Sequence, residues 1–474
     1  MPKTVSPGVQ ALRDVVEKVY RELREAKERG EKVGWSSSKF PCELAESFGL
    51  HVGYPENQAA GIAANRDGEV MCQAAEDIGY DNDICGYARI SLAYAAGFRG
   101  ANKMDKDGNY VINPHSGKQM KDANGKKVFD ADGKPVIDPK TLKPFATTDN
   151  IYEIAALPEG EEKTRRQNAL HKYRQMTMPM PDFVLCCNNI CNCMTKWYEN
   201  IARMCNIPLI MVDIPYNNTV EVSDSAVKYV RAQFDNAIHE LEKLTGKKFD
   251  EEKFELACKH ANRTAQNWLK VCDFLQYKPA PMSGFDLFNH MADVVTARGK
   301  EAAADAFELL SKDLQKNIEE GTSTLPFPEQ YRVMFEGIPC WPKLPNLFKP
   351  LKENGINVTA VVYAPAFGFV YNNMDEMARA YYKAPNSVCI EQGVAWREGI
   401  CRDNKVDGVL VHYNRSCKPW SGYMAEMQRR FTADLGVPCA GFDGDQADPR
   451  NFNEAQYTTR VQGLVEAMEA NKKD

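Results

Sequence analysis

Apolar and polar positions in the N-terminal part of the chain follow two different periods. Residues 8–30 carry apolar side chains at helical spacing and end at a glycine, so they predict an amphipathic helix. Residues 32–35 and 50–54 are short apolar runs typical of strands, and residues 41–47 between them have a helical composition. Strand, helix and strand in this order predict a βαβ unit with parallel strands.

The same rhythm continues after one interruption. Residues 59–79 and 84–98 are rich in alanine and predict helices. Residues 99–175 break the pattern, because Asp-Gly and Asn-Gly turn signals separate short apolar runs, so we expect a surface insertion with hairpin strands. The α/β pattern then resumes with strands at 182–185 and 208–212 and a helix at 195–204.

The second half of the chain begins with helices and ends with strands. Residues 222–277 predict two long amphipathic helices, and residues 299–320 predict another. Four later apolar runs predict strands at 331–335, 358–363, 408–413 and 437–442. The predicted fold is therefore α/β, with two parallel-sheet domains of the Rossmann or flavodoxin-like type. We expect the first domain, with its N-terminal helix, at 1–220, a helical connector at 221–328 and the second domain at 329–474.

Composition and charge argue against several kinds of partner. The 474 residues carry a net charge of −6, with acids and bases interspersed, so we expect no binding to nucleic acid or to an anionic membrane. No apolar run approaches the roughly 18 residues of a membrane span, and the charged N-terminal segment does not look like a signal peptide. Fifteen cysteines in a chain of this size favour free thiols in the cytoplasm over disulfides.

Chemically active side chains follow the predicted strands, where ligands bind in parallel α/β sheets. Ser38 and Glu56 follow the first two strands, and the segment Cys186–Cys193, with four cysteines, follows the third. Cys417 follows a strand of the second domain, and Cys85 stands at a helix start, where the helix dipole stabilises a thiolate. We therefore expect cysteines from three loops to meet in a cleft between the domains.

The spacing of the cysteines leaves the identity of the metal open. No two cysteines are separated by two residues, so the zinc-ribbon and ferredoxin patterns are absent. An iron–sulfur centre and a zinc site built from distant cysteines both remain compatible. Cys340, in a Pro-Cys-Trp-Pro turn, is a rival ligand, whereas His412 is expected to be a core residue.

Several motifs together resemble the 2-hydroxyacyl-CoA dehydratase family, and the likeness covers nearly the whole chain. They are Gly34–Ser38, Tyr54–Gly61, Asp83–Arg89, Cys186–Cys191 and Asn414–Lys418. The resemblance implies a 4Fe-4S cluster held by Cys85, Cys191 and Cys417, with one iron left without a protein ligand. It also implies a homologous beta subunit in a heterodimer and a transient, ATP-dependent iron–sulfur activator. The chain has no GxxxxGK[ST] phosphate loop of its own, in keeping with a separate activator.

The implied reaction removes water from an acyl-CoA substrate. The overall likeness favours (R)-2-hydroxyglutaryl-CoA, which gives glutaconyl-CoA. The thioester oxygen binds the open iron, one electron makes a ketyl radical anion, and the electron returns after hydroxide and the β-proton have left. By the same resemblance Ser38 donates a hydrogen bond near the leaving hydroxyl, and Glu56 is the acid–base partner. FMN or riboflavin is expected at the subunit interface, and 99–175 is expected to dock the partner subunit or cover that flavin.

Other functions fit the same residues. The chain could be a subunit that only holds a cluster or relays electrons, a zinc hydrolase with three cysteine ligands, or a dehydratase for another 2-hydroxyacyl-CoA. Ser38 could instead cap the helix that follows it, and Glu56 could serve the dipole of its own helix. Arg89 and Arg415 are candidates for a CoA phosphate or a substrate carboxylate, since a guanidinium binds such anions through two hydrogen bonds.

Overall fold

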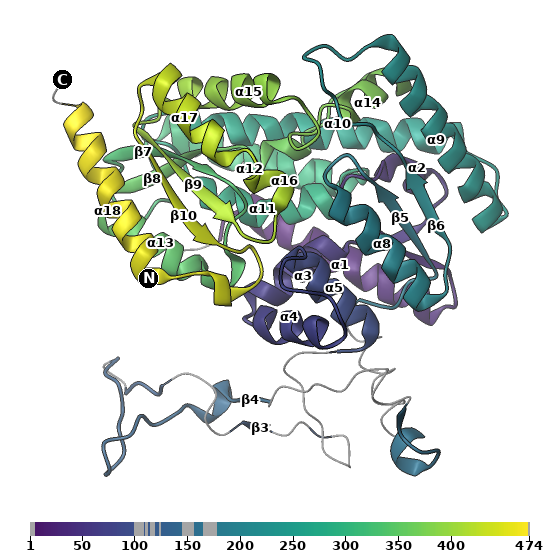
Figure 1. Ribbon diagram of the computed structural model, residues 1–474, viewed down its shortest axis with the longest axis horizontal. Coiled ribbons are helices and arrows are strands. Elements are labelled where there is room, and N and C mark those ends of the chain that lie inside the picture. Colours follow the sequence, from purple (N-terminus) through teal and green to yellow (C-terminus); the bar gives the residue numbers. More distant parts are fainter. Residues whose placement is uncertain are drawn as a thin grey trace.

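Two parallel β-sheets form the two halves of the molecule (Figure 1). The computed structural model describes residues 5–98, 109, 112–113, 119–122, 125–144, 156–164 and 178–472. The strand order is β2-β1-β5-β6 in the first sheet and β10-β9-β7-β8 in the second, and every neighbouring pair is parallel. The predicted α/β fold with two parallel sheets is confirmed.

The first sheet follows the predicted βαβ pattern closely. Its strands are β1 (Val33–Ser36), β2 (His51–Gly53), β5 (Phe183–Cys187) and β6 (Leu209–Val212). Helices α2 (Cys42–Ser47) and α8 (Asn192–Cys205) connect consecutive pairs of them. The predicted helix at 59–79 is two helices, α3 (Pro55–Ala64) and α4 (Gly68–Asp77), and α5 (Gly86–Ala96) follows. The break falls at Arg66, whose φ of 72° is a left-handed conformation that a helix does not contain.

The second sheet contains all four predicted strands. They are β7 (Tyr331–Glu336), β8 (Ile356–Val361), β9 (Gly408–Asn414) and β10 (Cys439–Gly444). The helices of this half are α13 (Leu344–Glu353), α14 (Met374–Tyr381), α15 (Ile390–Asp403), α16 (Lys418–Ser421), α17 (Met424–Leu435) and α18 (Glu454–Asn471).

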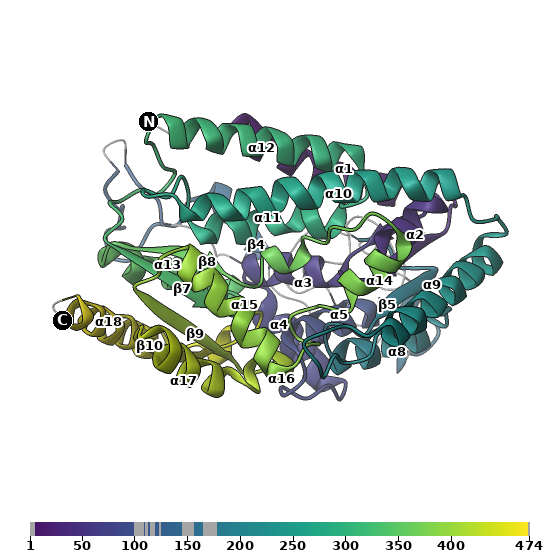
Figure 2. The same cartoon turned by 90° about the horizontal axis from the view of Figure 1, so that it is seen from above.

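A layer of long helices covers both sheets on one side. Figure 2 shows α1 (Pro7–Glu28), α10 (Glu251–Asp273), α11 (Gly284–Thr296) and α12 (Glu301–Glu319) running side by side there. Helix α9 (Asp224–Thr245) packs beside β6 at one end. Helix α11 was not predicted from the sequence, although its polar residues Asp286, Asn289, His290 and Asp293 recur at helical spacing on one face. No helix in the described residues is long and apolar enough to cross a membrane.

Side chains of successive strand residues pack into different cores. In β5, Phe183 and Leu185 belong to one large core shared with the helical layer, whereas Val184 packs with α5 and α8. In β7, Phe335 enters the same shared core, whereas Met334 packs with α15 and α17. Full burial of each such side chain stabilises the fold by about 1.5–3 kcal/mol. The shared core therefore joins the two sheets and fixes how their loops meet.

Part of the expected insertion is described. Strands β3 (Ile112–Asn113) and β4 (Lys143–Pro144) pair antiparallel, and isolated antiparallel bridges join Lys121 to Lys127 and Phe129 to Pro135. These are the short hairpin pairs that the turn signals predict. Figure 1 shows β3 and β4 apart from the two sheets, beyond α4. The remainder of 99–175 lies outside the described residues.

Candidate active site

Three cysteines from three separate loops line one pocket between the two halves of the molecule. Cys85, Cys191 and Cys417 are the N-cap residues of α5, α8 and α16, and Cys193 lines the same pocket. None of these three N-cap thiols accepts a capping hydrogen bond of full strength from its own helix. Instead, a backbone N–H three positions along the chain acts to lower the pKa of each thiol, and the residues concerned are Ala88, Met194 and Trp420.

The thiols disfavour each other's ionisation. Burial raises the pKa of Cys191 well above its usual value, and the neighbouring Cys85 and Cys417 raise it further. Burial likewise raises the pKa of Cys417 to about 12. A hydrogen bond between Cys85 and Cys193 raises the pKa of Cys85 and lowers that of Cys193. Thiolates at these positions therefore need a cationic group among them, and both zinc and the iron of iron–sulfur clusters are bound well by thiolates.

The pocket cysteines, as the structure describes them, do not form a site for a single metal ion. Within the described residues, no three His, Cys, Asp or Glu side chains come close enough together to hold one metal ion. A single Zn²⁺ requires all its thiolates within about 2.3 Å of one point. An iron–sulfur cluster binds each thiolate through a different iron, so its ligands stand farther apart. The pocket is narrow, at about 70 Å³, so a cluster and an acyl chain enter together only if lining side chains move.

Ser38 and Glu56 lie in the same pocket and bind each other. The backbone N–H of Ser38 donates to Glu56 Oε1 at 2.9 Å, and the Ser38 hydroxyl donates to Oε2. Tyr198 also donates to Oε1, at 3.4 Å. Burial raises the pKa of Glu56, and the hydrogen bonds from Ser38 oppose that rise. Ser38 does not cap the next helix, whose N-cap residue is Pro41, whereas Glu56 does stand in the first turn of α3.

Close contacts between the two halves position Cys85. The N–H of Gly86 donates to Ser416 Oγ at 2.9 Å, and a Cβ at Gly86 would stand only 2.8 Å from Asp445 Oδ1. The amide of Gln446 donates to Cys85 Sγ at 3.2 Å. The loops that carry Cys85 and Cys417 are therefore packed together through a glycine that leaves no room for a side chain.

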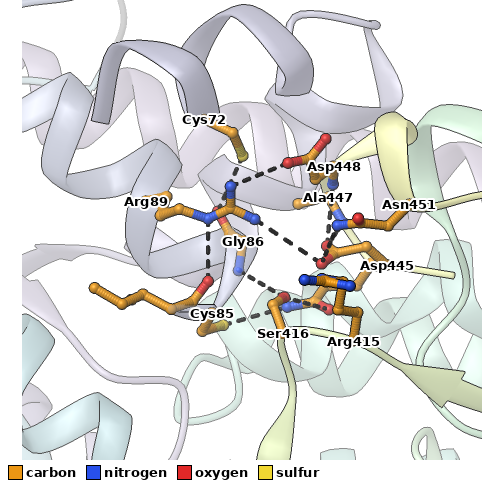
Figure 3. A network of polar contacts seen from close by, with 12 residues as sticks. Cys72, Cys85, Gly86, Arg89, Arg415, Ser416, Asp445, Ala447, Asp448 and Asn451 are labelled. Atoms are coloured by element: carbon orange, nitrogen blue, oxygen red, sulfur yellow. Dashed lines mark hydrogen bonds and ion pairs between the residues drawn. The ribbon is translucent and has the colours of Figure 1, made fainter. Parts of the chain in front are cut away.

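Arg89 belongs to this interface and not to an anion site, so that prediction was wrong. Its guanidinium is fully buried and donates to Asp448 at 3.0 Å (Figure 3). It also donates to Glu76 at 2.7 Å. Asp445 lies 4.0 Å away on the other side. A guanidinium held by three carboxylates is not free to bind a phosphate. Arg415 is half exposed and lies 3.7 Å from Asp83, so its role stays a prediction.

Cys340 and His412 lie in the core beside each other, outside the pocket lining. His412 Nε2 is 3.4 Å from Cys340 Sγ, and its Nδ1 is 2.6 Å from the carbonyl oxygen of Ile338. Burial lowers the pKa of His412 to about 4, and its ring stacks on Phe442 with 4.8 Å between centroids. His412 is thus the core residue that the sequence predicts, and Cys340 lies apart from the three pocket cysteines.

Sequence reasoning missed Lys39, which also lines the pocket. Its Nζ donates to the carbonyl oxygen of Ala366 at 2.5 Å and lies 4.7 Å from the centroids of the Phe367 and Phe369 rings. Burial and the nearby Arg298 lower the pKa of Lys39 to about 7. The run of small polar residues before it drew attention to Ser38, and a single lysine gives no periodic signal of burial.

A second cavity adjoins the pocket. It has a volume of about 230 Å³, lies between α3 and α11, and shares five lining residues with the pocket, namely Ser38, Glu56, Tyr87, Tyr363 and Phe367. At its other end Asn289 and Ala292 also line a larger cavity, of about 860 Å³, between α1, α11 and α12. The three cavities therefore share walls, from the cysteines past Ser38 and Glu56 to the helical layer.

Comparison with known proteins identifies the family. A family model described as "2-hydroxyglutaryl-CoA dehydratase, D-component" matches residues 163–468. The chain belongs to this family. Membership of the 2-hydroxyglutaryl-CoA dehydratase D-component family places it among the components of dehydratases, which are hydro-lyases.

Individual relatives cover nearly the whole chain. The chain is 86% identical over 471 residues to the (R)-2-hydroxyglutaryl-CoA dehydratase subunit alpha of Acidaminococcus fermentans, with 99% of each chain covered. It is 45% identical to the (R)-phenyllactyl-CoA dehydratase alpha subunit of Clostridium sporogenes, over 97% of this chain and 95% of that one. It is 40% identical to the (R)-2-hydroxyisocaproyl-CoA dehydratase alpha subunit of Clostridioides difficile, over 98% and 96%. The relatives share the dehydratase name and differ in the acyl group.

Proposed function

We propose that this chain is the iron–sulfur subunit of a dehydratase that removes water from (R)-2-hydroxyglutaryl-CoA and gives glutaconyl-CoA. The 86% identity to an alpha subunit named for that substrate supports the acyl group. The observation that carries the proposal is that Cys85, Cys191 and Cys417 share one pocket with Ser38 and Glu56. Ligands for a cluster and a hydrogen-bonded acid–base pair thus face the same space.

The three cysteines would hold a 4Fe-4S cluster with one iron free of protein ligands. When bound, this cluster would supply a Lewis-acidic iron and one electron to the thioester, whose ketyl radical anion can expel the neighbouring hydroxide. The helix starts at Cys85, Cys191 and Cys417 would favour the thiolate forms that bind iron. Among the described residues that line the pocket, Cys193 remains as a neighbour of Cys85 and not as a ligand.

Ser38 and Glu56 would carry out the proton transfer from the β-carbon to the leaving hydroxide. The Ser38 hydroxyl would donate to the departing hydroxide, and the Glu56 carboxylate would take the proton from the β-carbon and pass it to that hydroxide as water. One proton moves from carbon to oxygen and the electron is returned, so the net change is loss of water. The raised pKa of Glu56 makes it a stronger base than an exposed carboxylate.

The proposal includes partners. Three relatives of this chain are named as alpha subunits, which supports a second, homologous subunit for this chain. We propose that an ATP-dependent iron–sulfur activator delivers the electron, that FMN or riboflavin binds at the subunit interface, and that 99–175 docks the partner or covers the flavin. All fifteen cysteines lie in the described residues and none forms a disulfide bond, which suits a reducing cytoplasmic location.

Turnover by the reconstituted complex tests the proposal. The chain is co-produced with its partner subunit without oxygen, mixed with the activator, ATP and a reductant, and supplied with (R)-2-hydroxyglutaryl-CoA. Mass spectrometry should find glutaconyl-CoA, and omission of ATP should abolish its formation. The proposal is wrong if a complex with full iron content converts no 2-hydroxyacyl-CoA.

A further inference from the structure

The proposed substrate brings a negative charge into a buried pocket. A 2-hydroxyglutaryl group ends in a carboxylate, and transfer of an unpaired carboxylate out of water is strongly unfavourable. The pocket must therefore offer a cation or several hydrogen-bond donors at the far end of the acyl chain. Lys39 is the only lysine, arginine or histidine among the described residues that line the pocket.

The surroundings of Lys39 leave its charge without a carboxylate partner. The side chain is almost fully buried, and its ammonium group donates a hydrogen bond to the carbonyl oxygen of Ala366. The rings of Phe367 and Phe369 face the ammonium group but supply no hydrogen-bond acceptor of the carboxylate kind. An ammonium group has three donors, so two remain for a ligand that enters the pocket.

Neighbouring charges do not compete for Lys39. Arg298, which lies close enough to lower the pKa of Lys39, is 3.5 Å from the carboxylate of Glu43 in the core behind the pocket. Glu56 is held by Ser38, and its effect on Lys39 is smaller than that of burial. A ligand carboxylate in the pocket would therefore meet an amino group that has no other anion bound to it, and it would favour the ammonium form of Lys39.

The route through the cavities gives the ligand its direction. Ser38 and Glu56 line both the pocket and the second cavity, whereas Lys39 and the pocket cysteines line the pocket alone. A thioester whose CoA arm lies in the second cavity passes Ser38 and Glu56 first and extends its acyl chain into the pocket. Its acyl chain then lies in the pocket whose lining includes Lys39.

We propose that Lys39 binds the distal carboxylate of the acyl group and so selects dicarboxylic 2-hydroxyacyl-CoA substrates over uncharged ones. The inference rests on the proposed function and names the substrate class of the same site. A dicarboxylic substrate pairs the buried ammonium group with its distal carboxylate, whereas an aliphatic substrate leaves that group without a partner and without water. The first effect strengthens binding of the charged substrate and the second weakens binding of the uncharged one. It also replaces Arg89, which the structure removes as a carboxylate ligand.

The test compares two acyl groups of the same shape. The complex with the wild-type chain or with Lys39→Met is assayed with (R)-2-hydroxyglutaryl-CoA and with (R)-2-hydroxy-5-methylhexanoyl-CoA, in which an isopropyl group replaces the carboxylate. The ratio of the two kcat/KM values should fall by about 10- to 100-fold in Lys39→Met, as expected for a lost hydrogen bond to a charged group. Lys39→Arg, which keeps the charge, should retain the preference for the charged acyl group.

Controls separate binding from folding. Lys312→Met removes an exposed lysine on α12 and should leave the ratio unchanged. Calorimetric titration with glutaconyl-CoA and with the uncharged product compares the two affinities without turnover. The effect of Lys39→Met on this ratio can therefore be measured even in a variant that has lost its cluster. An unchanged ratio in both assays, with wild-type turnover present, overturns the role of Lys39 alone. No turnover of either substrate by the iron-replete wild-type complex overturns the proposed function as well.

Discussion

The carboxylate of Glu56 accepts hydrogen bonds from both the backbone N–H and the hydroxyl of Ser38, the first at 2.9 Å. The two residues follow neighbouring parallel strands, β1 and β2, so the sheet itself brings them together. Because both carboxylate oxygens are engaged by one residue, the orientation of Glu56 in the pocket is fixed before a substrate arrives. Such preorganisation is what an acid–base group needs.

Replacement of Glu56 should therefore separate chemistry from cluster binding. Glu56→Gln keeps the size of the side chain but cannot accept a proton, and we expect kcat to fall by about 10²- to 10⁴-fold. Iron content should stay at the wild-type level, because Glu56 is not among the proposed ligands. Turnover within a few-fold of wild type at full iron content would show that the chain does not use Glu56 as a base and would favour a purely electron-relaying subunit.

The pH dependence of kcat/KM tests the same residue differently. Burial raises the pKa of Glu56, so the base is ionised only above that raised value. We expect kcat/KM to be full at higher pH and to fall as the pH drops through a pKa above the ordinary 4.5 of a glutamate. Glu56→Gln should lack this acidic limb. An acidic limb that persists in Glu56→Gln would assign it to another group.

A methyl group added at Gly86 should shift the loop that carries Cys85. In Gly86→Ala the new Cβ would stand 2.8 Å from Asp445 Oδ1 and 2.9 Å from the Cβ of Ala447. Such overpacking costs about 1–3 kcal/mol. We expect the loop of Cys85 to shift and the iron content of the purified complex to fall. Gly61→Ala on α3 is the matched control, since its Cβ would meet nothing within 4 Å. Equal iron content in both variants would contradict the assignment of Cys85.

Arg89 should matter for stability. Arg89→Met leaves the buried carboxylates of Asp445 and Asp448 without this partner, and we expect the free energy of unfolding to fall by about 3 kcal/mol. Arg415→Met removes an exposed pair and should change it by less than about 1 kcal/mol. Urea unfolding of the two variants gives the comparison. Equal stabilities would mean that the interface of Figure 3 contributes little.

The strands were predictable because their apolar runs are buried on both faces, as in β5 and β7. Helix α11 was not predicted, although its polar residues, such as Asp286 and Asn289, recur at helical spacing on one face. The pocket cysteines stood out in the sequence because each follows a strand or begins a helix. The burial of Arg89 depends on Asp445 and Asp448, more than 350 residues away, and the position of Lys39 depends on aromatic rings from the other half. Such long-range contacts leave no local pattern.

Iron and acid-labile sulfide per chain, measured on the complex purified without oxygen, test the central claim most directly. We expect about four of each in the wild-type chain, and loss of both in Cys85→Ser, Cys191→Ser and Cys417→Ser. Cys193→Ser and Cys340→Ser, which alter a pocket neighbour and a core thiol, should keep them. A wild-type complex that is active without iron, or a Cys417→Ser variant that keeps a full complement, would contradict the account.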